Sequence, residues 1–225
     1  ARPAATACWR SIRKKTVADP RADLIATARA MQPAGLNRGT SGNVSMRCGT
    51  GFYITPTGMH YASLRDDDIP LMALDGLHDG ARKPSSEWRF HRDLYAARPE
   101  VGAVLHAHSP FAVSLACLRR DIPPFHYMIA RFGGDTIRCA DYAIFGSPEL
   151  STAAMHAMAD RKGCLLANHG LLVAGRDLAE ALALAVELEE LCEQYWRASQ
   201  LGEPVLLTPA EMRAVQEKFA GYGQQ

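Results

Sequence analysis

The sequence predicts an α/β layered domain, because segments with strand-like alternation and segments with helical periodicity interleave along the whole chain. The 225 residues are 48% hydrophobic and 22% charged, a composition typical of one large globular domain. No internal repeat or low-complexity linker divides the chain. We therefore expect a single domain over residues 17–225, after a basic N-terminal extension over residues 1–16 that has no acidic side chain.

The first third of the chain predicts one helix followed by short strands. Asp19 and Pro20 suit the N-cap and the first turn of a helix that ends near Gly35. A turn of small residues follows. Strands are then expected over residues 44–47, 51–55 and 69–74.

The middle third predicts a helix and a buried strand in succession. Pro84, Ser85, Ser86 and Glu87 begin a helix that stops before Pro99. The apolar residues that follow predict a strand ending at the histidines 106 and 108. Further helices are expected over residues 110–118 and 148–161, with a strand over residues 135–139 between them.

The last third predicts an interrupted strand and two helices. An apolar run over residues 165–173 is broken by Asn-His-Gly, and a helix rich in Ala, Leu and Glu follows over residues 177–200. Thr208 and Glu211 form a capping box for a last helix. The glutamates of the long helix are expected to form a solvated face and not a metal site: Glu187, Glu189, Glu190 and Glu193.

Charge and cysteine content limit the classes of partner and the compartment. Lys and Arg number 25 against 24 Asp and Glu, so no general charge excess favours nucleic acid or an anionic membrane. No apolar run reaches the roughly 18 residues that a membrane helix needs. The six cysteines are widely spaced, which predicts reduced thiols and a cytoplasmic protein.

His106 and His108 are the sharpest chemical feature of the sequence. Residues i and i+2 of a strand face the same side, so the two imidazoles would project together, as transition-metal ligands do. His169 is a third candidate, because it ends an apolar run and precedes Gly170. Three histidines with one open position are the usual catalytic zinc site. The alternative is that the histidines share no metal and that one of them is simply hydrogen-bonded in the core. Spacing alone does not bring His169 to the other two.

Glu87 is the candidate acid or base. It follows two serines at a helix start, where exposed amides and hydroxyls can receive an anion. The residues alone favour a plain helix start, with serine as cap and glutamate balancing the helix dipole. The remaining histidines, His91 included, show no pairing pattern and are expected on the surface or in the core.

Three short hydroxyl and glycine segments could hold a phosphate without Lys or Arg. Glycine lets a backbone approach a ligand closely, although each segment alone is also typical of a plain turn. The residues concerned are Gly42, Asn43, Thr57, Gly58, Ser85 and Ser86.

Seven stretches in the same order resemble the class II aldolase/adducin family over about residues 22–223. They are GLNRGTSGNVSMR (35–47), YITPTGMHY (53–61), KPSSEWRFH (83–91), AVLHAHS (103–109), HYMIARFGGDTIRCADYAIFG (126–146), NHGLL (168–172) and EKFAGYG (217–223). The resemblance implies a three-layer α/β/α fold around a central, largely antiparallel sheet. It also implies a homotetramer with active sites at subunit interfaces.

The resemblance assigns roles to the candidate residues. It implies one Zn²⁺ per subunit held by His106, His108 and His169, with Glu87 as acid/base and additional ligand. The six residues of the three turns would hold the substrate phosphate. Tyr127, Phe145 and Tyr222 would shape catalysis, with Tyr222 reaching the site of a neighbouring subunit.

The implied reaction is the zinc-dependent, reversible cleavage of L-fuculose 1-phosphate or a similar ketose 1-phosphate. The products are dihydroxyacetone phosphate and an aldehyde. Other branches of the family leave a sugar-acid phosphate decarboxylase, a methylthioribulose-phosphate dehydratase and a ketose-phosphate 4-epimerase as alternatives. A non-catalytic scaffold like the adducin head is the alternative from a different class, and it would be expected to lack the metal ligands that are present here.

Overall fold

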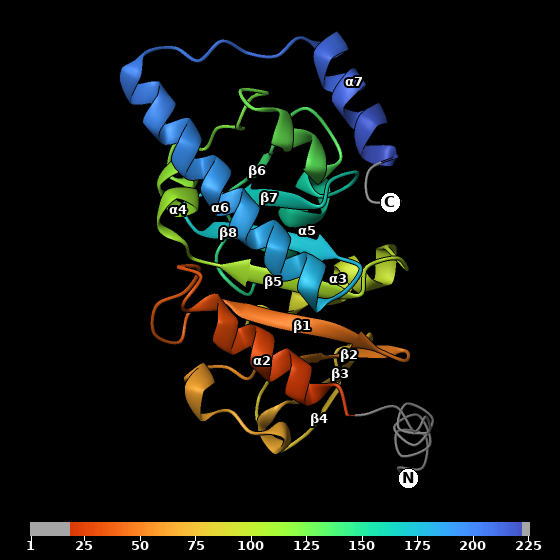
Figure 1. Ribbon diagram of the computed structural model, residues 1–225. Helices are drawn as coiled ribbons and strands as arrows, with labels where there is room; N and C mark the ends of the chain where they lie inside the picture. Colours follow the sequence, from red (N-terminus) through yellow and green to blue (C-terminus); the bar gives the residue numbers. More distant parts are fainter. Residues whose placement is uncertain (1–18, 222–225) are drawn as a thin grey trace.

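The computed structural model describes residues 19–221 (Figure 1), so the extension expected over residues 1–16 and Tyr222 lie outside the described residues. A central sheet of eight strands has the order β4-β3-β2-β1-β5-β8-β7-β6. Every neighbouring pair is antiparallel except β6 and β7. The strands are β1 (Asn43–Cys48), β2 (Gly51–Ile54), β3 (Leu71–Ala73), β4 (His78–Asp79), β5 (Ala103–Ala107), β6 (Cys139–Ala140), β7 (Gly163–Leu166) and β8 (Gly170–Gly175).

Helices cover both faces of the sheet, which confirms the expected three-layer α/β/α fold. Figure 1 shows α2 and α6 crossing one face, with α3 and α5 behind the sheet. The helices are α2 (Arg21–Met31), α3 (Trp88–Ala97), α4 (Pro110–Ala116), α5 (Pro148–Ala157), α6 (Leu178–Leu201) and α7 (Pro209–Ala220). Short 3-10 helices cover Tyr61–Ser63 (η1), Asp66–Asp68 (η2) and Tyr127–Phe132 (η3).

The alternation along β5 divides the core into two layers. Ala103 and Leu105 belong to the larger apolar cluster, which includes buried residues of α2, α4 and α6. Val104 belongs to the second cluster, formed with α3 and α5. His106 follows Val104 by two residues and contacts the ring of Phe90 on α3, so its imidazole lies on that second face. Side-chain alternation on a strand thus places the histidine in the buried layer beneath α3.

Several element boundaries differ from the sequence prediction. The strand expected over residues 135–139 is reduced to β6, with an isolated bridge joining Ile122 and Ile137. This segment forms the edge of the sheet, where only one neighbour is available for pairing. The helix expected over residues 148–161 ends at Ala157, and the short strand β4 was not expected.

The predicted starts of α6 and α7 are confirmed, whereas the predicted cap of α2 is not. Asp177 caps α6 by accepting a hydrogen bond from the Glu180 amide at 2.8 Å. Thr208 and Glu211 form the expected capping box of α7. Asp19 is not the N-cap of α2, because that position belongs to Pro20.

The prediction of one solvated glutamate face on α6 was wrong for two of its members. Glu187 forms an ion pair with Arg131 at 3.0 Å. Glu189 accepts hydrogen bonds from Ser109 and from the start of α4. Helical periodicity places these side chains on the helix but does not show which other segments contact them.

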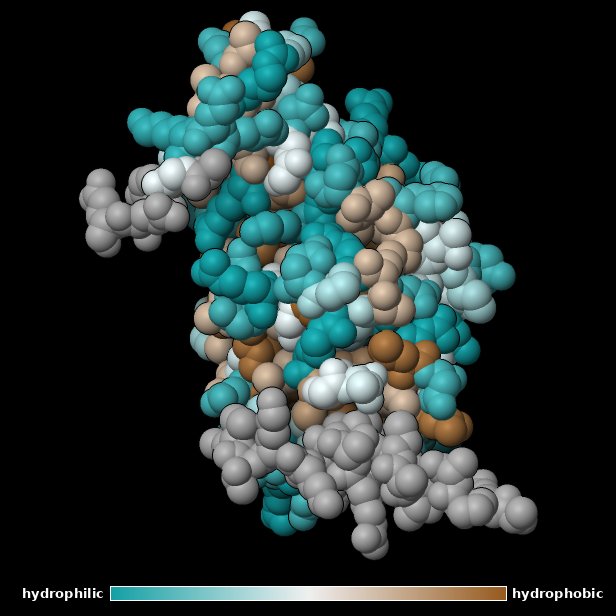
Figure 2. Space-filling view, turned by 90° about the vertical axis from the view of Figure 1, so that its right-hand side faces the viewer, coloured by the Kyte–Doolittle hydropathy of each residue, from teal (hydrophilic) through white to brown (hydrophobic). Residues whose placement is uncertain are grey.

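The described residues contain no long apolar helix. None of the described helices has the length and hydropathy needed to cross a membrane. Figure 2 shows hydrophilic and hydrophobic residues mixed over the part of this face that is described. The cysteines of the described chain are all free, and Cys8 lies outside it: Cys48, Cys117, Cys139, Cys164 and Cys192.

Candidate metal centre and substrate pocket

The fold brings together the four residues that the sequence nominated as metal ligands. His106 lies on β5, His108 directly follows β5, and His169 lies in the turn between β7 and β8. Glu87 stands at the N-cap of α3. One ligand atom from each of these residues lies within 4.8 Å of all the others. The structure therefore supplies the proximity that sequence spacing could not show.

Close strand packing places His169 beside the other two histidines. Asn168 adopts a left-handed conformation with φ of 54°, which turns the chain sharply before His169. A Cβ atom at Gly170 would lie 2.3 Å from the Ala107 carbonyl oxygen, so only glycine permits this approach. The His106 and His169 rings are consequently 4.7 Å apart between centroids.

The orientation of His106 is fixed by the backbone of β8. Its Nδ1 lies 2.8 Å from the carbonyl oxygen of Leu171, so Nδ1 carries the proton and donates it. The lone pair is then on Nε2, which lies 2.9 Å from Nε2 of His108. A hydrogen bond from the distal ring nitrogen is the usual way in which proteins orient a metal-binding histidine.

The charge state of the cluster suits metal binding. Burial and the neighbouring imidazoles lower the pKa of His108 to about 4, so its ring is neutral at neutral pH. Burial opposes ionisation of Glu87, but His106 and His169 outweigh it and hold the pKa of Glu87 well below its usual range. A neutral imidazole, as at His108, and an ionised carboxylate, as at Glu87, are the forms that ligate metals.

The unsatisfied atoms of the cluster fit a divalent cation. Glu87 Oε1 is buried without a hydrogen-bond partner and lies 3.1 Å from Nε2 of His169. A buried carboxylate oxygen left in this way is costly unless a cation or a substrate group completes it. Three imidazole nitrogens with one carboxylate oxygen form a donor set typical of zinc and similar ions.

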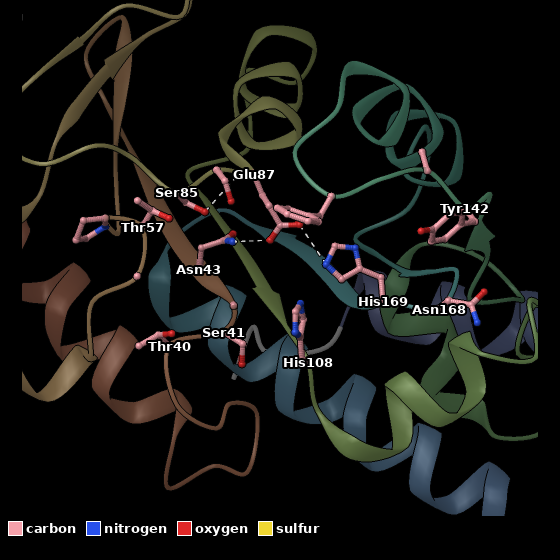
Figure 3. Close-up of a pocket in the computed structure, with 16 residues that line it drawn as sticks. Thr40, Ser41, Asn43, Thr57, Ser85, Glu87, His108, Tyr142, Asn168 and His169 are labelled. Atoms are coloured by element: carbon pink, nitrogen blue, oxygen red, sulfur yellow. Dashed lines mark hydrogen bonds and ion pairs between the residues drawn. The ribbon is translucent and has the colours of Figure 1, made fainter.

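A pocket of about 360 Å³ opens onto this cluster. Figure 3 shows Thr40, Ser41, Thr57 and Ser85 on one side, with Tyr142 and Asn168 on the other. The polar side offers hydroxyl groups and the backbone of glycines, with no Lys or Arg among its lining residues. All six residues expected to hold phosphate line the pocket: Gly42, Asn43, Thr57, Gly58, Ser85 and Ser86.

The turn at Gly42 requires glycine. Its φ is +78°, and a Cβ atom there would lie 2.6 Å from Asn37 Oδ1 and 2.8 Å from the His106 carbonyl oxygen. On the same polar side of the pocket, Ser85 Oγ accepts a hydrogen bond from the Glu87 amide at 3.3 Å. The expectation of a serine cap was wrong, because Glu87 itself occupies the N-cap of α3 and the helix has no side-chain cap, while the Glu87 side chain turns toward the histidines.

The three aromatic candidates lie in different places. Phe145 lines the pocket and is 65% exposed. Tyr127 is half exposed, does not line the pocket, and stacks on Phe219 of α7 at 6.4 Å. Tyr222 lies outside the described residues, and its assigned role stays a prediction.

Sequence reasoning missed residues on the far wall of the pocket. Asn168 Oδ1 accepts a hydrogen bond from Arg119 Nε at 2.6 Å, and the Arg119 guanidinium lies over the ring of Tyr142. Arg119 and Asn168 are the non-glycine residues with positive φ in the described chain. An Asn-His-Gly triplet is a sequence signal for a left-handed turn, whereas nothing around Arg119 marks it.

Comparison with known proteins agrees with the fold and the cluster. The family profile described as Class II Aldolase and Adducin N-terminal domain matches residues 22–196. The chain belongs to the class II aldolase/adducin family and is a metal-dependent aldolase, an aldehyde-lyase. Several curated relatives that match it over most of their length are named as aldolases.

Two curated relatives and one solved structure are especially similar. The 5-methylthioribulose-1-phosphate/5-deoxyribulose-1-phosphate aldolase of Rhodospirillum rubrum is 55% identical over 200 residues, covering 89% of this chain and 90% of the relative. The L-fuculose phosphate aldolase of Escherichia coli K12 is 43% identical over 201 residues, covering 89% and 94%. A structure of L-fuculose 1-phosphate aldolase matches with a TM-score of 0.87 and 38% identity, covering 91% of this chain and 98% of the other.

Proposed function

We propose that this aldolase cleaves a five-carbon, 5-deoxy ketose 1-phosphate between C3 and C4. The products are dihydroxyacetone phosphate and a short aldehyde, with Zn²⁺ as the metal. The observation that carries this proposal is the cluster of Glu87 and three histidines, which lies at the floor of the pocket. The polar wall of that pocket is lined by hydroxyls and glycines and has no Lys or Arg. The cluster, with a metal bound, suits the carbonyl and hydroxyl oxygens of a ketose. The polar wall suits the phosphate of the same substrate.

The phosphate is assigned to the polar wall. Backbone N–H groups and hydroxyls can bind a phosphate without a formal positive charge. Thr57 and Ser86 are exposed there, and Ser85 lies at the start of α3, whose N-terminus favours an anion. A phosphate held on this wall would direct the ketose carbonyl toward His106, His108 and His169.

The chain's own residues move the protons. When bound, the metal supplies Lewis-acid stabilisation of the negative charge that develops on substrate oxygens as the C3–C4 bond breaks. The bonding electrons stay on C3, and the Glu87 carboxylate takes up a proton from solvent and passes it to that carbon. The proton of the C4 hydroxyl leaves as the aldehyde forms, and Tyr127 or Tyr222 relays it to solvent. In the reverse direction the same groups carry both protons back.

The aldehyde is assigned to the wall formed by Tyr142, Ala143 and Phe145. A 5-deoxy or 5-methylthio pentulose phosphate releases an aldehyde whose tail has no hydroxyl, which suits this aromatic lining. The identity to the Rhodospirillum relative also exceeds the identity to the fuculose enzymes. L-Fuculose 1-phosphate is the second candidate, because an aldolase named for it shares the fold at a TM-score of 0.87.

We further propose a cytoplasmic homotetramer with active sites at subunit interfaces. Tyr127 is exposed and lies away from its own pocket, as expected of a residue that serves the site of a neighbouring subunit. The free thiols of the described chain support a reducing compartment.

The test compares three substrates on the zinc-loaded protein. 5-Deoxyribulose 1-phosphate, 5-methylthioribulose 1-phosphate and L-fuculose 1-phosphate are supplied at equal concentration, and dihydroxyacetone phosphate is followed through an NADH-coupled reductase. We expect a higher kcat/KM for the first two, and loss of the signal in Glu87→Gln. No dihydroxyacetone phosphate from any of the three would reject aldol cleavage and favour the decarboxylase or dehydratase alternatives.

A further inference from the structure

His91 lies at the centre of a buried hydrogen-bond chain that leads to Glu87. The imidazole is fully buried beneath β1, and both ring nitrogens have partners. Nδ1 lies 2.7 Å from Ser45 Oγ, and Nε2 lies 2.5 Å from Asn43 Oδ1. Asn43 then donates from Nδ2 to Glu87 Oε2 at 3.1 Å (Figure 3).

The Glu87 carboxylate at the end of this hydrogen-bond chain determines which group donates and which accepts in every bond before it. An ionised carboxylate only accepts, so the Asn43 amide must present its N–H₂ to Glu87 and its oxygen to His91. His91 must therefore carry its proton on Nε2 and accept from Ser45 on Nδ1. Ser45 in turn accepts from the hydroxyl of Tyr95 at 2.8 Å. All donors point from Tyr95 toward Glu87.

The surroundings keep His91 in this single form. Burial lowers the pKa of His91 to about 3, so the ring stays neutral and has one donor and one acceptor. Phe90 stacks on the ring with centroids 4.9 Å apart and limits its rotation. The tautomer is thus fixed by its two partners, and the ring by its neighbour.

The hydrogen-bond chain from Tyr95 to Glu87 contacts only one of the two carboxylate oxygens of Glu87. Oε2 is held by the Asn43 amide and lies 3.3 Å from Nε2 of His106. Oε1 has no hydrogen bond and faces His169. One oxygen is anchored while the other remains free for a metal or a substrate proton.

We propose that His91 is a positioning residue for catalysis: through Asn43 it orients the Glu87 carboxylate so that Oε1 faces the metal and the reacting carbon. This inference rests on the proposed function for its kinetic consequence, but the orientation itself does not depend on which ketose phosphate is cleaved.

Two substitutions at position 91 separate positioning from simple packing. His91→Gln places an amide N–H₂ near the original Nε2 and can still donate to Asn43. His91→Asn has a shorter side chain whose amide lies near the original Nδ1, so the bond to Asn43 is lost. Tyr95→Phe is the matched control, because it removes the far end of the chain and leaves the bonds among Ser45, His91, Asn43 and Glu87.

The first readout is exchange of the dihydroxyacetone phosphate C–H with deuterated solvent in zinc-loaded protein. This half-reaction needs Glu87 and no aldehyde. We expect His91→Asn to lower the exchange kcat by about 10- to 100-fold with KM nearly unchanged, as is usual for a lost partner of a metal-site residue. His91→Gln should recover most of the rate, and Tyr95→Phe should retain it.

The second readout is the visible spectrum of the Co²⁺-loaded protein, which reports the ligand arrangement without turnover. We expect the spectrum to change in His91→Asn and to be preserved in His91→Gln. If His91→Asn does not fold, Asn43→Ala breaks the same hydrogen-bond chain and must give the same change in the Co²⁺ spectrum, which does not depend on phosphate binding. Wild-type rates and spectra in these variants would overturn the positioning role. A wild-type protein without exchange activity would reject the proposed function, and the spectra alone would then decide the role of His91.

Discussion

Glu189 holds the start of α4 directly after the metal ligand His108. Its carboxylate accepts hydrogen bonds from the Phe111 and Ala112 amides, each at 2.8 Å, and from Ser109 Oγ at 2.6 Å. Pro110 has no N–H, so these are the first two backbone donors that the helix offers. Glu189→Ala should therefore leave both amides and a buried hydroxyl without their acceptor.

The expected cost follows from these contacts. A hydrogen bond to a charged group contributes about 1.5 kcal/mol at the lower end of its range, so the two amide bonds together give about 3 kcal/mol. For a chain of this size, that loss lowers Tm by about 6 to 12 °C. Because His108 precedes Ser109, we also expect Zn²⁺ affinity to fall by about 10-fold.

The assay is thermal unfolding of the metal-free protein at one fixed protein concentration, followed by zinc titration. Glu190→Ala is the matched control, since Glu190 is the next residue of α6 and its carboxylate accepts an exposed hydrogen bond from Gln194 on the same helix. We expect that control to stay within about 0.5 kcal/mol of wild type. If the two variants unfold together, Glu189 does not stabilise α4 and the reasoning fails.

Three further predictions concern the metal, the pH and the backbone. His106→Ala should lose its zinc after dialysis while the exposed His156→Ala keeps it, as measured by elemental analysis; stoichiometric zinc in His106→Ala would contradict the site. The pKa of His91 is about 3 in the folded chain against about 6.5 when unfolded, so protons bind the unfolded chain more strongly as pH falls. Urea unfolding without metal should show a loss of about 2 kcal/mol from pH 7.5 to pH 5 that His91→Gln lacks; equal slopes would refute this. Gly102→Ala should destabilise the fold by about 3 kcal/mol, because its Cβ would lie 1.9 Å from the Arg176 carbonyl oxygen. The control is Gly221→Ala, whose Cβ would lie 4.0 Å from the Lys218 carbonyl oxygen; its free energy of unfolding in the same denaturant titration should stay near that of wild type. A Gly102→Ala variant as stable as this control would show that the backbone can shift to admit the methyl group.

The sequence predicts those parts of the site that depend on local geometry. Strand alternation places His106 and His108 on one side, and that pairing needs no tertiary information. His169 and Glu87 could be nominated but not joined, because their approach depends on the β5–β8 pairing and on the direction in which α3 starts. The resemblance to a family was needed to connect them.

The supporting residues could not be predicted for a physical reason. Glu189 has backbone partners 77 and 78 residues away, and backbone groups leave no trace in a sequence pattern. His91 has the spacing of an ordinary core residue on α3, and its partners on β1 are 46 and 48 residues away. In both cases helical periodicity gives the face of the helix but not the polar groups that the neighbouring segment presents.

The two walls of the pocket rest on different kinds of backbone. The histidines lie on or beside central strands of the sheet, whereas Tyr142, Ala143 and Phe145 belong to an exposed segment without regular secondary structure. Substitutions in such a segment disturb few core contacts and change stability little. Substitutions at the wall that faces the aldehyde can therefore accumulate without disturbing Glu87 and the three histidines. Substrate preference can then change more easily in evolution than the reaction itself.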